Sequence, residues 1–179
     1  MKKLSIFLIS LALISGASTA AFAAAASSSV LDVHAVGGIG VFNNGGGTNL
    51  DLGAGADYFV MPQISLGVDF NYSPVSTGFA GASASAMLFT GNVKYNFADD
   101  LKGLYIGVRA GLALDTFSVT GGPSQSNSQF AFGGVAGYDY TVMPNFSIGP
   151  ELDYVYITAP SGGSAGGDFE ALANLKYWF

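Results

Sequence analysis

Apolar and polar residues alternate along most of the chain beyond residue 30. The segment 64–72 shows the pattern most clearly, because every second residue is apolar and Ser, Gly, Asp and Asn stand between them. Successive side chains of a β-strand point to opposite faces, so this alternation predicts strands with one apolar and one polar face. Eight segments share it: 30–42, 49–60, 64–72, 86–97, 104–117, 129–142, 146–156 and 168–179.

The connections between these segments are of two kinds. Those near Pro62, Asp100 and Pro144 are short turns with Pro or Asp. Those near residues 45, 79, 123 and 162 are mostly longer and rich in Gly and Ser. Short turns at one end and looser loops at the other are typical of transmembrane β-barrels.

The last segment ends in Tyr177-Trp178-Phe179, and its residues Phe169, Ala171, Ala173, Leu175, Tyr177 and Phe179 share one face. Loose termini of water-soluble proteins are normally polar. A closed barrel in lipid accommodates this ending, because the last strand then pairs with the first and turns its apolar face to acyl chains.

The pattern therefore predicts an all-β fold, an eight-stranded antiparallel up-and-down transmembrane β-barrel. Strands of roughly ten to fourteen residues suit a tilted crossing of a bilayer. Beyond residue 23 no stretch has the length and apolarity of a transmembrane helix, and Gly interrupts every segment with helical spacing.

The first residues have the features of a cleaved signal peptide. Lys2 and Lys3 precede an uncharged apolar run, and the small residues Ala21 and Ala23 flank Phe22. The run is nearer twelve residues than the roughly twenty that a membrane span needs. We therefore expect a signal peptide over residues 1–23, Sec export, a short flexible terminus over 24–29 and one barrel domain over 30–179.

One hairpin sequence occurs twice. Residues 55–67 (GADYFVMPQISLG) correspond to residues 137–149 (GYDYTVMPNFSIG). The alternation places Tyr58 and Tyr140 on the outer face near a turn, where the amphipathic ring favours a membrane interface. Two copies are too few for a soluble solenoid, so the repeat is interpreted as two equivalent barrel hairpins.

These hairpins, the segment 97–107 and the terminal Tyr-Trp-Phe resemble the small OmpA/OmpX-like outer-membrane β-barrels of Gram-negative bacteria. The resemblance covers essentially all of residues 30–179. It implies that Tyr177 and Phe179 form the signal read by the barrel-assembly machinery. It also implies periplasmic chaperones and outer-membrane lipids as partners, and a monomer. Unlike full-length OmpA relatives, this sequence shows no peptidoglycan-binding domain after the barrel.

Charge excludes one class of partner. Without Lys2 and Lys3, four bases (Lys94, Lys102, Arg109 and Lys176) face the 12 Asp and Glu residues. Nucleic-acid binding needs a basic surface, so no nucleic-acid partner is expected. The chain has no Cys, so no disulfide supports it.

The polar faces would gather charged residues in the lumen, where each charge must be paired or hydrated. We expect Arg109 and Lys94 to pair with residues such as Asp69, Asp139 or Glu151. Two interpretations stay open: a polar plug, favoured because eight strands leave room for little beyond side chains, and a cation-preferring path, which the acidic excess and the inward glycines favour. The expected charge network comprises Lys94, Arg109, Lys176, Asp69, Asp139, Glu151 and Glu170.

Catalytic, cofactor and metal sites are not expected. His34 is the only His, and the serines nearest to it in sequence, Ser27–Ser29, lie at the terminus; a triad needs nucleophile, base and orienting group together. The acidic residues follow strand alternation rather than the spacing of a calcium loop. Gly37–Gly40 and the glycines at 45–47 lack the strand-to-helix context of a phosphate loop.

The leading functional prediction is a non-enzymatic outer-membrane barrel with a structural or surface role. The second is a narrow, weakly cation-selective, porin-like channel. The third is adhesion or ligand binding, which the expected loops favour least, since they carry almost no charge and only Phe79 as a large apolar residue.

Overall fold

The computed structural model describes residues 31–43, 48–75, 81–98, 103–159 and 165–179. The expected signal peptide (1–23), the terminus 24–29 and most of the loops near residues 45, 79, 100 and 162 lie outside these residues. Among the described residues, no helix is both long and apolar enough to cross a membrane.

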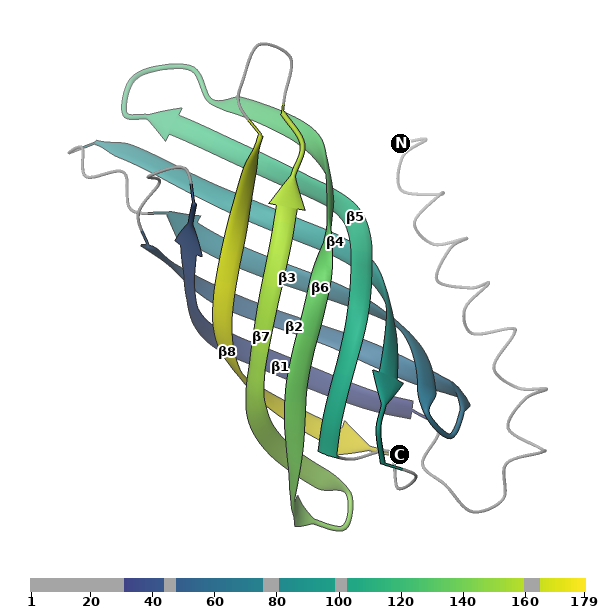
Figure 1. The fold of residues 1–179 in the computed structure, drawn as a ribbon. Helices are drawn as coiled ribbons and strands as arrows, with labels where there is room; N and C mark the ends of the chain where they lie inside the picture. The colour runs from purple at the N-terminus through teal and green to yellow at the C-terminus, as the bar shows by residue number, and fades with distance from the viewer. Residues whose placement is uncertain (1–30, 44–47, 76–80, 99–102, 160–164) are drawn as a thin grey trace, which may run out of the picture. The chain divides into compact units, whose positions relative to one another are not determined.

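The described chain forms a closed antiparallel barrel in which each strand pairs with its sequence neighbours and the first strand pairs with the last (Figure 1). This confirms the predicted all-β, eight-stranded, up-and-down barrel. Its strands are β1 Leu31–Phe42, β2 Thr48–Met61, β3 Ile64–Val75, β4 Ala82–Asn96, β5 Gly103–Val119, β6 Gln125–Met143, β7 Phe146–Ile157 and β8 Gly166–Trp178.

The β1–β8 seam closes the barrel in continuous register. Asp32 lies opposite Trp178, and the pairing continues to Phe42 opposite Asp168. At the end with the short turns, the Phe179 amide donates to the Leu31 carbonyl at 2.9 Å. Both ends of the described barrel chain therefore lie beside the β2–β3, β4–β5 and β6–β7 connections, and we call this the turn end. The opposite end is the loop end.

The predicted strand ends were wrong for the β5–β6 hairpin. Residues 118–128 were expected to form a loop, but the two strands stay paired as far as Phe117 and Gln125. Hydroxyl groups stabilise this polar extension, since Thr116 and Ser126 Oγ atoms lie 3.3 Å apart and Ser118 donates to Ser124 at 3.2 Å. Polar composition there marks strands that are hydrated on both faces, not a long loop.

The sequence repeat corresponds to a structural repeat. The β2–β3 pairing shifts register between Phe59 and Met61, and the β6–β7 pairing shifts at the equivalent place, between Thr141 and Met143. A β-bulge adds one residue to one strand and increases the local twist. Both copies therefore enter their Pro-containing turns through the same irregularity.

The two faces of the wall differ in chemistry as the alternation predicts. Outward side chains are mostly apolar and accessible, for example Val108 at 64 % exposure and Tyr140 at 58 %; Tyr58 is half-buried. Two small apolar clusters lie inside, Phe59 with Trp178 near the turn end and Leu88, Ala113, Ala131 and Val155 near the loop end, and Val36, Val135 and Leu172 are buried outside them. Most other buried side chains of the described residues are polar or charged.

Candidate functional site

The lumen is the candidate site because it buries nearly all the charge of the described chain. Nine carboxylates, three bases and His34 are at most 8 % exposed. The carboxylates are Asp32, Asp51, Asp57, Asp69, Asp139, Glu151, Asp153, Asp168 and Glu170, and the bases are Lys94, Arg109 and Lys176. Asp115, at the loop end, is half-buried.

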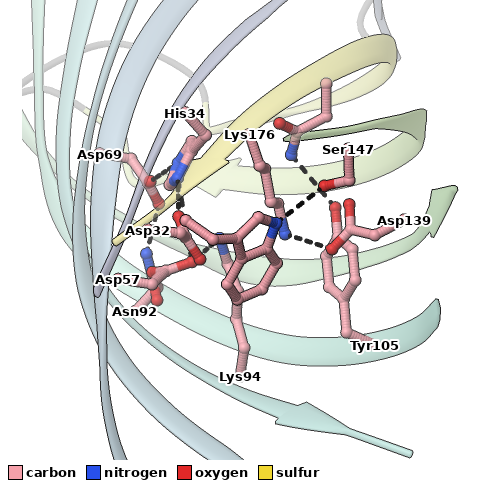
Figure 2. A network of polar contacts seen from close by, with 12 residues as sticks. Asp32, His34, Asp57, Asp69, Asn92, Lys94, Tyr105, Asp139, Ser147 and Lys176 are labelled. Carbon is pink, nitrogen blue, oxygen red and sulfur yellow. Dashed lines mark hydrogen bonds and ion pairs between the residues drawn. The ribbon is translucent and has the colours of Figure 1, made fainter. Parts of the chain in front are cut away.

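His34 on β1 bridges two carboxylates (Figure 2). Its Nδ1 lies 2.9 Å from Asp32 Oδ1, and its Nε2 lies 2.9 Å from Asp69 Oδ1. Asn92 Nδ2 donates to the other Asp69 oxygen at 2.7 Å. An ionised carboxylate only accepts hydrogen bonds, so an imidazolium with a proton on each ring nitrogen would satisfy both contacts.

Lys94 and Arg109 join the same network from β4 and β5. Lys94 Nζ donates to Asp57 Oδ2 at 2.8 Å. Arg109 forms an ion pair of 2.7 Å with Asp153 and lies 3.8 Å from Asp69 Oδ2. Each of these side chains is at least nine-tenths buried, so the ion pairs are shielded from screening by salt.

Tyr105 occupies the middle of the network and is fully buried. Its hydroxyl donates to Glu151 Oε2 at 2.5 Å, and Asn174 Nδ2 donates to the same oxygen at 2.8 Å. Lys176 Nζ lies 3.9 Å from the centre of the Tyr105 ring and donates to Asp139 Oδ2 at 2.8 Å (Figure 2). An ammonium over an aromatic face is attracted by the ring quadrupole.

Trp178 fills the lumen near the turn end. Its ring packs against Phe59 with centroids 5.5 Å apart, and its Nε1 donates to Ser147 Oγ at 3.1 Å. Trp178 is 1 % exposed and Ser147 is 0 % exposed. Together with Tyr105 and its partners, these side chains form what we call the plug: Phe59, Tyr105, Ser147, Glu151, Asn174, Lys176 and Trp178.

Inward glycines allow side chains two strands apart to meet. Gly55 on β2 lies between His34 and Asp69, and a β-carbon there would lie 2.5 Å from His34 Nε2. Gly137 on β6 is paired with both Tyr105 and Glu151, and a β-carbon there would collide with the Tyr105 ring. These glycines were expected to favour water-filled space. At these positions the space is instead taken by side chains that reach over the glycine strand.

The seven residues of the expected charge network all lie inside the barrel, but their contacts differ from the expected ones. Arg109 is near Asp69 as expected, although its shorter ion pair is with Asp153. Lys94 was expected beside Asp69, Asp139 or Glu151, and its hydrogen bond is instead with Asp57. The reason is Gly67 on β3, which pairs with Asp57 and leaves open the space over which that carboxylate extends.

Glu170 is separate from the bases. No ion pair within 4.0 Å joins it to a Lys, Arg or His among the described residues. It clusters instead with Asp51 and Asp168, whose ligand atoms lie within 4.8 Å of one another and of Glu170. Asn49 Nδ2 donates to Asp51 and to Asp168, at 2.8 and 3.2 Å, and Ser73 Oγ donates to Asp51.

Sequence reasoning favoured a polar plug but did not identify its central residues. The alternation of apolar and polar residues puts Tyr105 and Trp178 on the polar faces of their strands, but it does not mark them as central. The available signal was a large aromatic residue on an otherwise polar strand face, which in a narrow barrel must fill the lumen.

The geometry around His34 does not suit the usual histidine chemistry. A general base or a metal ligand needs an imidazole nitrogen with a free lone pair. Both His34 nitrogens are directed at carboxylates. The cluster Asp32–His34–Asp57 brings three potential metal-binding side chains together, but Lys94 already neutralises Asp57.

A closed eight-stranded barrel with an apolar exterior and an ion-paired interior defines a class, the small membrane β-barrels. Comparison with sequence families identifies the family within this class. The model of the outer membrane protein beta-barrel domain matches residues 9–176. The chain belongs to this family, which indicates the outer membrane as its location. No sequence among curated proteins matches significantly.

Solved structures of small outer-membrane barrels share the fold. The crystal structure of Neisserial surface protein A matches with a TM-score of 0.69 and 17 % identity, covering 83 % of this chain and 96 % of that one. The N-terminal barrel domain of Pseudomonas aeruginosa OprF matches at 0.53 and 16 %, covering 85 % and 98 %. Ail, the attachment invasion locus protein of Yersinia pestis, matches at 0.53 and 13 %, covering 83 % and 99 %.

Proposed function

We propose that this protein is a monomeric, non-enzymatic barrel that spans the outer membrane, with a structural or surface role and a closed lumen. The observation that carries the proposal is the plug. Tyr105, Ser147 and Asn174 are each 0 % exposed although they lie inside the barrel wall. A water-filled channel would leave such side chains accessible to solvent.

The outer face supports the membrane-spanning part of the proposal. Large apolar side chains are exposed on all eight strands, from Val33 on β1 to Tyr177 on β8. Monomeric soluble proteins rarely expose continuous apolar surface of this extent. In lipid the same surface is favourable, and closure of the barrel satisfies the backbone hydrogen bonds of every strand.

Conductance in planar bilayers tests the closed lumen. We expect purified protein reconstituted in a bilayer to show no conductance steps above background. The double variant Tyr105→Ala with Trp178→Ala removes the two largest side chains of the plug and should produce conductance steps. The proposal would be overturned in favour of the channel if the wild-type protein showed conductance steps and these steps changed in the Arg109→Ala variant.

The channel is the second candidate, and the observation that favours it is the charge balance. The described lumen buries nine carboxylates against three bases and one His, and an acidic ring attracts cations. Any current through a loosened plug should therefore be cation-selective, which reversal potentials in a KCl gradient measure.

Adhesion is the third candidate. Two proteins of the same fold have names that suggest it, Neisserial surface protein A and the attachment invasion locus protein of Yersinia pestis. The described β5–β6 tip argues against it here, because residues 118–128 contain no charged or aromatic side chain that would serve as a binding anchor.

A further inference from the structure

A cavity of about 330 Å³ lies at the loop end of the lumen, and we call it the mouth cavity. Side chains from β1, β4, β5, β6 and β7 line it, so it lies inside the ring of strands and not on the outer wall. The described residues that line it include none of the plug. Its volume is at the lower end of the range for small-molecule sites, about 300–1,000 Å³.

Three neighbouring strands form one wall of the mouth cavity. β4, β5 and β6 stay paired side by side at this end of the barrel (Figure 1). The pairing aligns lining side chains in two rows across the strands, the first being Ala86, Asp115 and Asn127 and the second Ala84, Phe117 and Gln125. Both rows have the parity of the lumen residues further along the same strands, so they continue the inward face up to the mouth.

One part of the lining is apolar. Phe42 on β1 and Ile157 on β7 are half-buried and join Ala84, Ala86 and Phe117 around the cavity. Ile157 also packs against the buried apolar cluster of the loop end. Phe117 is 44 % exposed. Covering this surface with the apolar part of a ligand would be favourable, because it removes apolar area from water.

The polar part of the lining carries one charge, the carboxylate of Asp115. No Lys, Arg or His is among the described residues that line the cavity, and none in the described chain forms an ion pair with Asp115. Gln129 donates a hydrogen bond to Asp115 Oδ2, and the side chains of Gln125 and Asn127 are exposed. A half-buried carboxylate without a base attracts cations, and apolar walls strengthen that attraction.

We propose that the mouth cavity binds a small organic cation, a primary ammonium group carried by an aromatic or branched aliphatic body. The ammonium pairs with Asp115, and the body covers Phe42, Phe117 and Ile157. A fully apolar ligand leaves the carboxylate without a counter-charge, and an anion finds no positive group in the described lining. A Ca²⁺ ion would need six to eight oxygen ligands, whereas Asp115 is the only carboxylate among these lining residues.

This inference goes beyond the proposed structural or surface role and does not require an open lumen. A ligand in the mouth cavity stops short of the plug, so a barrel that conducts nothing can bind it. Bilayer conductance and ligand binding therefore test two separate statements, and either can fail alone.

Phenethylamine and phenethyl alcohol are suitable probes, because an ammonium group in the first replaces a hydroxyl group in the second. The refolded full chain in detergent micelles is titrated with each probe, and the side-chain amide signals of Asn127 are followed by two-dimensional NMR. We expect the amine to shift these signals saturably with a dissociation constant of about 1 mM, an affinity attainable for so small a ligand. The alcohol should bind about tenfold more weakly, because it lacks the charge-assisted contact with Asp115.

Asp115→Asn removes the charge but keeps an oxygen that can accept the Gln129 hydrogen bond. Its affinity for the amine should fall about tenfold, to that of the alcohol, and its affinity for the alcohol should stay within about twofold of wild type. Asp168→Asn is the matched control, because Asp168 is a carboxylate at the same end of the lumen, is 4 % exposed and does not line the mouth cavity. This variant should keep the preference for the amine.

Ala86→Leu tests the cavity apart from the charge. The larger side chain takes up space beside Asp115 and should weaken both probes about fivefold or more. The inference is overturned if no wild-type signal saturates, if wild type binds both probes equally, or if Asp115→Asn keeps the preference for the amine. Equal loss of that preference in Asp168→Asn and Asp115→Asn would show unspecific charge attraction and also overturn it.

Discussion

At the scale of single residues, the interior depends on buried charges that have specific partners. Lys94 and Asp57 are 2 % and 1 % exposed and share a 2.8 Å hydrogen bond. An ion pair of this kind gains little over an apolar pair, but removing one partner leaves an uncompensated buried charge. Replacing one partner of such a buried ion pair should therefore destabilise the barrel strongly. Replacing both partners together should cost much less stability.

Lys94→Met tests this sensitivity. The variant leaves Asp57 buried without its ammonium, and we expect a loss of about 3–5 kcal/mol in the free energy of unfolding. Urea titrations in lipid vesicles, followed by Trp178 fluorescence, give the value. The double variant Lys94→Met with Asp57→Asn should recover a large part of the loss. A double variant as unstable as the single one would show that packing of the Lys94 chain, rather than charge, is decisive.

At the scale of the strand, each β-strand has an apolar outward face and a face that lines the lumen. The free-energy cost of placing a charge on the outward face depends on how deep in the bilayer that residue lies. Val108 lies within β5, five residues after its first residue Gly103, and Met143 lies beside a turn, at the end of β6. Their exposed fractions are nearly equal, 64 % and 63 %. A bilayer around the barrel would place Val108 deeper than Met143.

Val108→Arg should therefore destabilise the barrel by about 2–4 kcal/mol in vesicles, and Met143→Arg by about 1 kcal/mol or less. The comparison uses unfolding free energies of both variants in the same lipid. Equal effects in the two variants would mean that the barrel does not span the bilayer at the proposed depth.

The strands and their faces were predictable because a period of two places every inward residue once the start of a strand is known. This rule assigns Asp57, Lys94 and Tyr105 to the lumen. Which of them meet was not predictable, because contacts between strands two apart depend on the stagger of the barrel and on glycines such as Gly67. The polar extension of β5 was missed for a different reason, since Ser and Thr fit both loops and hydrated strands.

At the scale of the whole molecule, we expect the barrel-assembly machinery to read the terminal aromatic residues Tyr177 and Phe179. Tyr177 and Phe179 are 45 % and 60 % exposed, so they add little to the interior packing. If they serve as an assembly signal, their effect should appear in cells and not in the stability of the refolded protein.

The substitution Phe179→Ala, which keeps the backbone bond to Leu31, tests that separation. The amount of folded barrel in bacterial outer membranes should fall, while the unfolding free energy of the refolded protein should stay within about 0.5 kcal/mol of wild type. Phe97→Ala is the control, because Phe97 is an outward aromatic at the same end and is 52 % exposed. Equal losses in cells for both variants would rule out a special role for the terminus.

The β1–β8 seam also has a consequence for the rate of folding. Seven of the eight strand pairings join consecutive strands and can form as local hairpins, whereas this one joins the first strand to the last. Pairings of large sequence separation form slowly, because chain entropy is lost before contacts compensate for it. Until the seam closes, β1 and β8 are two open edges that can pair with another chain. The time for which those edges stay open, more than the final stability, should decide whether a newly made chain becomes a barrel or an aggregate.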